Sequence, residues 1–500
     1  MSLHIIHKQK VILNINSMDD AFNYQNTVSK LFANGLSTAI EQLLDELDTP
    51  NTVTRIDELK VDLGEIIGSG FNQQFKDKLL DGLKNSITTA QRNPGKNATI
   101  IKQSASLKDG FIHFIKRGTF PWYIEAKNMA AFEACLFSTW NDADWKSITD
   151  WLQDNFGKTI IERLVWQFSN NFLKQILSTS LSEVIDDQNC LMLLNDLQYL
   201  NNRLENKNQS SKEFLTQTFS FVFHANKSYS LNTLIADQIL EAVKNENASF
   251  NKYYDDIVSN IKTDIITTIV NNIEFLLEKQ VSLNHVSAND ILIKDKEKLN
   301  EILISDHLNE TQAGKKIESS KSLKNKNKSL ADDTEPLVIH NCGIVLLHPF
   351  LQSYFEELLL IRNKSFVSDD AQKKCILLLH YLSTGINEAE EFDLALEKIL
   401  CGYALEETLP TTINLTQQQI DESAKLLEIV INYWSPLKNT SAEGLQKTFL
   451  QREGKLGAKE NGWQLTIEQK TVDILLNKLP WGFSTIKLPW MKDMLSVNWC

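Results

Sequence analysis

The chain has 500 residues, of which 42% are hydrophobic, and it carries a formal net charge of −13 at pH 7. The apolar content excludes a globally disordered chain, and the length predicts roughly two to four structural units rather than one core. The negative charge argues against nucleic acid as a partner, because phosphate binding requires clustered cations.

Residues 1–86 are expected to form a β-α-β-α module. Apolar side chains alternate from about Lys8 to Ile15, which predicts a strand. A helical stretch with a break near Gly35 follows and ends at Leu47. Pro50 marks a turn after it.

The second half of this module repeats the pattern. Alternating apolar residues from Ile56 to Leu63 predict a second strand, and apolar residues at helical spacing predict a helix from Phe71. Residues 87–106 are polar and contain Pro94, so we interpret them as a linker.

Residues 107–306 are predicted to be mostly helical. No proline and only two glycines occur between Trp122 and Glu335, and apolar residues recur there at helical spacing. Laid end to end, this stretch would span on the order of 320 Å of helix. Polar breaks such as residues 201–211 favour helices that fold back over one extended rod, although the sequence leaves both arrangements open.

Residues 307–336 are expected to be a disordered linker, because they are rich in Lys, Ser, Asn and Asp and have almost no apolar content. We interpret their lysine cluster as a solvated spacer rather than a docking patch. Residues 337–500 then form a tryptophan-rich α/β module. Pro349 suits the first turn of its first helix, and Gly385 ends the next.

Local signals within this carboxy-terminal module are strong. Thr416 and Gln419 form a capping box at the start of a helix, and a second helix is predicted from Thr440 to Gly454. Alternation from Trp463 to Ile467 predicts a strand. A short helix over residues 471–478 and a strand near Ile486 and Leu488 complete the module.

Tryptophan is concentrated at this end of the chain. Two Leu-Pro-Trp tripeptides repeat nine residues apart, at residues 479–481 and 488–490. Aromatic side chains dominate cores and interfaces, so this density predicts a packed module or a docking surface rather than a sugar-stacking site. The candidate partner-binding residues are Trp434, Trp463, Trp481, Trp490 and Trp499.

No complete catalytic, cofactor-binding or metal-binding motif is present. Gly157-Lys158-Thr159 has the tail of a phosphate loop, but Leu152 occupies the position of the first glycine, and we interpret Gly157 as a helix C-cap. His348 and His380 are interpreted as structural histidines. The six cysteines are too scattered for a zinc site or a disulfide framework, so we expect reduced thiols in a cytoplasm.

The amino terminus carries lysines where a secretory signal would need an apolar run, and no apolar stretch is long enough to span a bilayer. We therefore expect neither a signal peptide nor membrane insertion. Together, the patterns predict a mainly α, multi-domain protein with small α/β terminal modules, a helical middle and a disordered linker.

Ordered runs at both ends of the chain resemble the tape measure proteins of extracellular contractile injection systems, which are phage-tail-like particles with a tube, a sheath and a baseplate. The matching stretches are His4–Phe32, Arg55–Ile66, Phe111–Tyr123, Gly343–Leu358, Ala371–Gly385, Leu396–Gly402, Leu437–Leu456 and Leu479–Met491.

The resemblance implies a non-enzymatic assembly protein that sets tube and sheath length and has tube, baseplate or cap subunits as partners. It implies a place in the cytoplasm during assembly and then in the particle lumen. The alternative is an assembly adaptor or chaperone that binds tube or baseplate subunits through the tryptophan-rich end.

Overall fold

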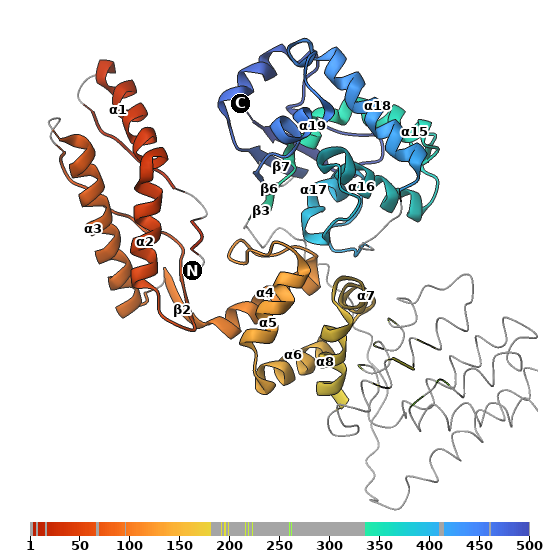
Figure 1. Ribbon diagram of the computed structural model, residues 1–500, viewed down its shortest axis with the longest axis horizontal. Helices are drawn as coiled ribbons and strands as arrows, with labels where there is room; N and C mark the ends of the chain where they lie inside the picture. Colours follow the sequence, from red (N-terminus) through yellow and green to blue (C-terminus); the bar gives the residue numbers. More distant parts are fainter. Residues whose placement is uncertain are drawn as a thin grey trace, which may run out of the picture. The chain divides into compact units, whose positions relative to one another are not determined.

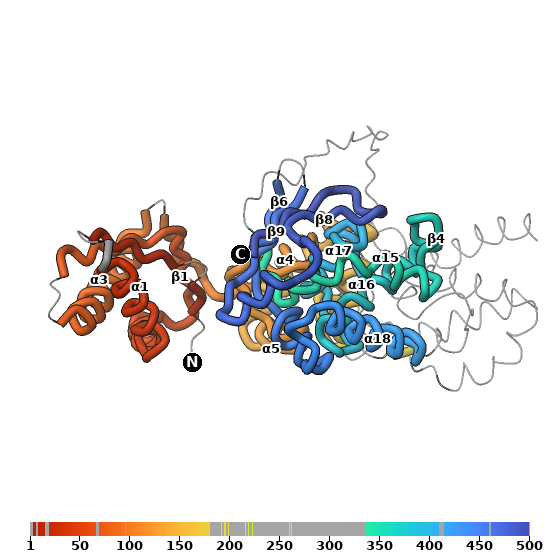
Figure 2. Tube along the Cα trace, turned by 90° about the horizontal axis from the view of Figure 1, so that it is seen from above, coloured from red at the N-terminus to blue at the C-terminus, as the bar shows by residue number. Residues whose placement is uncertain are grey.

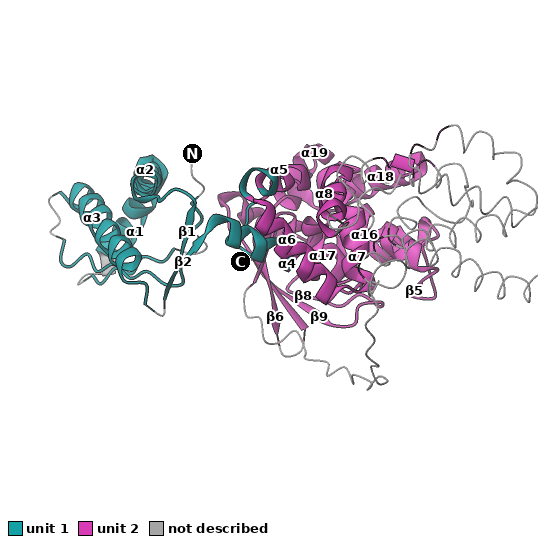
Figure 3. Cartoon of the chain, turned by 90° about the horizontal axis from the view of Figure 1, so that it is seen from below, with its two compact units in different colours: residues 1–112, 120–125, 136–139 teal, residues 113–119, 126–135, 140–500 magenta. Residues whose placement is uncertain are grey.

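The computed structural model describes two compact units (Figure 3). Unit 1 comprises residues 1–112, 120–125 and 136–139, and unit 2 comprises residues 113–119, 126–135 and 140–500. The described residues are 4–6, 9–15, 18–66, 70–95, 97–181, 336–409, 415–459 and 462–499, with single positions 192, 195, 196, 199, 216, 219, 223, 260 and 262.

Helices dominate the described residues, and a small mixed sheet lies near the carboxy terminus, which confirms the expected fold class. Most of the middle region and the expected linker at 307–336 lie outside the described residues, Pro336 excepted. The five-part domain division read from the sequence therefore stays a prediction.

Three described helices lie wholly within unit 1 (Figure 1): α1 (Met18–Leu31), α2 (Ser37–Leu47) and α3 (Phe71–Arg92). A π-helical turn at Phe32–Leu36 joins the first two and bends at Gly35, whose φ is 106°. Glycine adopts this positive φ without a steric penalty, and the predicted break is confirmed. The core of the unit is formed by Val28, Leu36, Ile40 and Phe75.

Both strands predicted for this module are placed wrongly. Residues 9–15 are extended but form no strand, and their alternation comes from side chains that face α1 rather than a sheet. The strand predicted at 56–63 is instead β1 (Thr52–Ile56). It pairs antiparallel with β2 (Ala98–Lys102), which lies within the polar segment that was interpreted as a linker. Pairing with a distant partner thus decided where the strand formed.

Five helices follow without an intervening strand. An Asn141–Asp144 capping box starts α6 (Asp142–Asn155). Gly157 is the N-cap residue of α7 (Lys158–Gln167), so its interpretation as a C-cap is wrong. The five are α4 (Gln103–Arg117), α5 (Met129–Thr139), α6 (Asp142–Asn155), α7 (Lys158–Gln167) and α8 (Asn170–Leu181).

The carboxy-terminal part of unit 2 contains a five-stranded sheet in the order β3-β6-β7-β9-β8. All neighbours are antiparallel except β7 and β9, which are parallel. The predicted strand at 463–467 is confirmed, whereas β9 was not anticipated. The strands are β3 (Leu337–Ile339), β6 (Gly454–Lys459), β7 (Gly462–Ile467), β8 (Thr485–Ile486) and β9 (Met494–Asn498).

Helices pack against this sheet, with α16 and α18 to one side of it (Figure 2). Short elements connect them: the 3-10 turns η3 (Cys342–Leu347), η4 (Glu391–Asp393), η5 (Ser435–Leu437) and η7 (Thr471–Lys478), and the hairpin β4 (Ile361–Arg362) and β5 (Ser365–Phe366). The helices are α15 (His348–Glu357), α16 (Asp369–Thr384), α17 (Ala395–Leu400), α18 (Gln417–Tyr433) and α19 (Ala442–Leu445), the last continued by the π-helical turn η6 (Gln446–Leu450).

Local capping signals located most of these helices. The Thr416–Gln419 capping box and the left-handed cap at Gly385 are confirmed, and Pro349 lies in the first turn of α15. The helix predicted over 440–454 begins later and ends earlier, because Ser441 rather than Thr440 caps it, and β6 already begins at Gly454.

Candidate functional site

Two of the five candidate tryptophans are wholly internal. Trp434 has no exposed surface, its indole N–H donates to the carbonyl oxygen of Leu475 at 3.1 Å, and its ring centroid lies 4.6 Å from that of Phe449. Trp499 is also buried and donates to Oδ2 of Asp473 at 3.1 Å. Both indoles have their polar atom satisfied inside unit 2, so they act in packing.

The buried side chain of Arg452 packs against the indole of Trp499. Arg452 pairs with Asp473, and its guanidinium lies 5.7 Å from the ring centroid of Trp499. Asp473 also accepts the backbone N–H of Lys470 at 2.7 Å. The carboxylate thus joins the turn after η6, the start of η7 and the carboxy-terminal end of the described chain. This residue was not identified from the sequence.

The other three candidate tryptophans are half-buried. Trp463 lies on β7, where it packs against the core. The two Leu-Pro-Trp repeats use their indoles alike: Trp481 donates to the carbonyl of Leu346 at 2.9 Å, and Trp490 donates to that of Leu400 at 2.8 Å. Each tryptophan thereby holds the carboxy-terminal loop against a distant segment, and part of its ring stays exposed at the surface.

Arg163, Glu391 and Lys398 form a buried ion cluster in unit 2. Oε1 of Glu391 lies 3.1 Å from Nη2 of Arg163 and 2.7 Å from Nζ of Lys398. The hydroxyl of Thr408 donates to its Oε2 at 3.0 Å. Two cations therefore share one carboxylate away from water, where an unpaired charge is costly.

Backbone carbonyls complete the coordination of both cations. Arg163 donates to Ile115 and Glu406, and Lys398 donates to Leu405 at 3.1 Å and to Glu407 at 2.7 Å. Burial lowers the pKa of Lys398, an effect that Glu391 opposes. The cluster ties α4, α7 and the 391–408 segment together.

Sequence reasoning missed this cluster. The one available signal was the charged pair Glu397-Lys398 inside the apolar run of α17, a helix of six residues that are all buried. A charged pair on so short and apolar a helix indicates polar partners from elsewhere in the fold. The sequence does not show that Arg163 and Glu391, which lie 228 residues apart, are those partners.

Glu397 forms a second buried polar pair with Asn341. The amide of Asn341 donates to Oε1 of Glu397, while Oδ1 of Asn341 and Oε2 of Glu397 have no hydrogen-bond partner in the described residues. Burial raises the pKa of Glu397 well above its usual value, and the neighbouring Asp393 raises it further. Burial therefore favours the neutral form of this acid over its charged form.

We expect Glu397→Gln to be at least as stable as the parent at pH 8, because an amide cannot ionise. Because the pKa of Glu397 is raised in the folded state, its contribution to the free energy of unfolding is fully present below the unfolded-state pKa of about 4.3. This contribution is lost as the pH rises through the folded-state pKa. The advantage of the variant should therefore shrink toward pH 4. Asp393, Cys342 and Cys401 also face this acid, and burial raises the pKa of each.

Urea unfolding at several pH values measures this difference. Glu428→Gln, which changes an exposed carboxylate of α18, is the matched control and should leave the profile unchanged. A Glu397→Gln variant that loses about 2 kcal/mol or more at every pH would show that the charge itself is needed.

Of the two histidines interpreted as structural, His380 is buried and His348 is half-buried. Burial lowers the pKa of His380 to about 4, and it also lowers the pKa of His348, whose Nδ1 lies 2.9 Å from the carbonyl of Val345. Across the described ranges, no group of three or more His, Cys, Asp or Glu side chains is arranged to hold a metal ion. No described helix is both long and apolar enough to cross a membrane.

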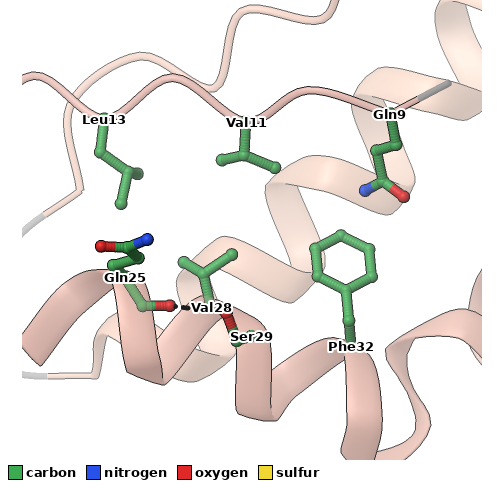
Figure 4. Close-up of a pocket in the computed structure, with 7 residues that line it drawn as sticks. All are labelled: Gln9, Val11, Leu13, Gln25, Val28, Ser29 and Phe32. Atoms are coloured by element: carbon green, nitrogen blue, oxygen red, sulfur yellow. Dashed lines mark hydrogen bonds between the residues drawn. The ribbon is translucent and has the colours of Figure 1, made fainter. Parts of the chain in front are cut away.

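Unit 1 has a shallow pocket of about 300 Å³ between the extended residues 9–13 and α1 (Figure 4). Val11 and Leu13 face Val28 and Phe32 across it, and amides and one hydroxyl complete the lining. The lining contains no acid, base or nucleophile suited to catalysis, so we assign it no chemistry.

A model of the family described as contractile injection system tape measure protein matches residues 3–499. The match includes the middle of the chain as well as both ends. Comparisons with curated proteins and with solved structures gave no match.

Proposed function

The chain belongs to the family of contractile injection system tape measure proteins, and on that premise we propose that it sets the length of the tube and sheath during particle assembly. Membership gives the chain a structural role in a contractile injection system. In our proposal, the chain covers the growing tip of the tube until the tube is as long as the chain can span, and polymerisation then stops.

The supporting observation is that the segments before and after the middle stretch both belong to unit 2. Residues 140–181 and 336–499 belong to this one compact unit, and the ion cluster joins Arg163 to Glu391 across the intervening chain. Roughly 150 residues therefore start and finish at the same anchor. If unit 2 stays folded, their helical reach is at most half of their contour of about 230 Å at 1.5 Å per residue.

A ruler must be elongated, whereas unit 2 is a compact fold, and this anchoring accommodates both. Unit 2 remains a folded anchor, and the chain between Leu181 and Pro336 supplies the reach. Residues added in whole helical turns lengthen that reach without disturbing the anchor, whereas the densely capped ends do not tolerate insertions.

The adaptor alternative has one observation in its favour. Tyr433 and Ile429 of α18 are exposed apolar side chains on the tryptophan-rich unit, as a subunit-binding surface requires. An adaptor and a ruler both need such a surface, so it does not separate the two functions.

Electron microscopy of particles from cells that lack this chain separates them. The length-setting proposal predicts tubes and sheaths whose lengths scatter widely or that fail to form. The adaptor alternative predicts missing baseplates, with no effect on the length of the tubes that do form. Restoring the full chain should restore one narrow length distribution.

A further inference from the structure

Unit 2 buries apolar side chains in two places, one before and one after the middle stretch of the chain. Every described member of the larger core, whether buried or half-buried, lies between residues 337 and 499, and we call this part the carboxy-terminal lobe. We call residues 113–119, 126–135 and 140–181 of the same unit the helical lobe. Its core contains a series of aromatic contacts, with ring centroids 4.4 to 6.0 Å apart, through Phe114, Phe168, Phe172, Trp145 and Trp140.

Polar contacts join the two lobes. Hydrogen bonds cross between them from Nη2 of Arg163 to Oε1 of Glu391 at 3.1 Å, from Nε2 of Gln167 to the carbonyl of Leu409 at 2.7 Å, and from the N–H of Met129 to Oε1 of Glu390 at 3.3 Å. Oε1 of Gln167 is buried without a hydrogen-bond partner among the described residues. Such a joint opens at lower cost than an apolar core, because water replaces the hydrogen bonds that are lost.

The buried ion cluster is divided unequally between the lobes. Glu391, Lys398 and Thr408 belong to the carboxy-terminal lobe, where Nζ of Lys398 and the hydroxyl of Thr408 both donate to the carboxylate. Of the four side chains, Arg163 alone comes from the helical lobe. If Arg163 leaves, Glu391 keeps a counter-charge and a hydrogen bond, and the guanidinium gains water. Separation therefore leaves neither lobe with an unpaired buried charge, which is the usual obstacle to breaking a buried ion pair.

We propose that Arg163 and Glu391 form a releasable clasp between two separately folded lobes, and that the closed clasp holds the two ends of the middle stretch together. The closed state gives the doubled-back path of a chain that leaves and returns to one anchor. The open state lets Leu181 and Pro336 move apart while each lobe keeps its fold. The consequence for reach rests on the proposed length-setting role, whereas the clasp itself does not.

The test uses the full chain with one protease site inserted within residues 307–336, the stretch that the sequence predicts to be a linker. After cleavage, the two pieces of the parent should elute as one complex at micromolar concentration. Arg163→Gln should weaken their association by about a hundredfold or more, because it removes one partner of a buried, hydrogen-bonded charge pair. The separated pieces should each keep the circular dichroism and the tryptophan emission of a folded protein.

Two further variants separate the clasp from general stability. Lys158→Gln removes an exposed cation from the same helix and should leave the complex intact. Lys398→Met weakens the carboxy-terminal lobe from within but leaves Arg163 paired with Glu391, so its pieces should also stay together.

Four results would overturn the clasp. The pieces of Lys398→Met could separate as readily as those of Arg163→Gln, in which case association follows stability alone. The Arg163→Gln complex could stay intact, its pieces could unfold once separated, or the parent could fall apart on cleavage. Particle length is not measured, so a failure of length control is distinguished from each of these results.

Discussion

Glu391→Gln is expected to lower the free energy of unfolding of unit 2 by about 3–5 kcal/mol. Glutamine keeps the size and an acceptor oxygen but removes the single negative charge between Arg163 and Lys398. Two buried cations then face each other without a counter-charge. Chemical denaturation monitored by tryptophan fluorescence measures the loss.

Lys398→Met is the matched control for this charge argument. It removes the second cation and leaves Arg163 paired with Glu391, so we expect a smaller loss, arising from the carbonyls of Leu405 and Glu407 that lose their donor. If Glu391→Gln unfolds like the parent while Lys398→Met is severely destabilised, the carboxylate is not the centre of the cluster.

Gly343→Ala is expected to cost about 3 kcal/mol or more, since overpacking against backbone leaves little room to relax. A Cβ at this position would overlap the carbonyl oxygen of Phe449 and crowd the Cα of Leu450. The contact joins η3 to η6, so relief requires two buried segments to separate. Thermal melting of the purified variant measures the effect.

Gly482→Ala serves as the control for backbone entropy. A Cβ at Gly482 meets nothing within 4 Å, so this variant should melt close to the parent. Equal melting temperatures for the two alanine variants would contradict the close packing of η3 on η6.

Elements defined by neighbouring residues were predictable, and elements defined by distant partners were not. The capping box at Thr416 and the glycine cap at Gly385 place helix ends by contacts within one turn. By contrast, β1 and β2 depend on each other across more than forty residues, and alternation alone put the first of them in the wrong place.

The same distinction applies to the candidate site. Composition identified the tryptophan-rich unit, but it did not separate Trp434, which is internal, from Trp481, which reaches the surface. Tyr433 was overlooked because one exposed aromatic residue on a helix has no periodic signal. The partnership of Arg163 with Glu391 arises only in the folded chain, so no spacing rule reveals it.

The most direct test of length control is a deletion of about 36 residues, in whole helical turns, from the stretch between Leu181 and Pro336. In the helical arrangement that the sequence predicts, the deletion removes on the order of 54 Å of helix, and a chain that leaves and returns to one anchor should shorten the particle by about 27 Å. The lengths of purified particles, measured by electron microscopy, should shift by this amount and stay narrowly distributed. Particles of unchanged length, assembled with a stably folded deletion variant, would contradict the proposal that this chain is the ruler.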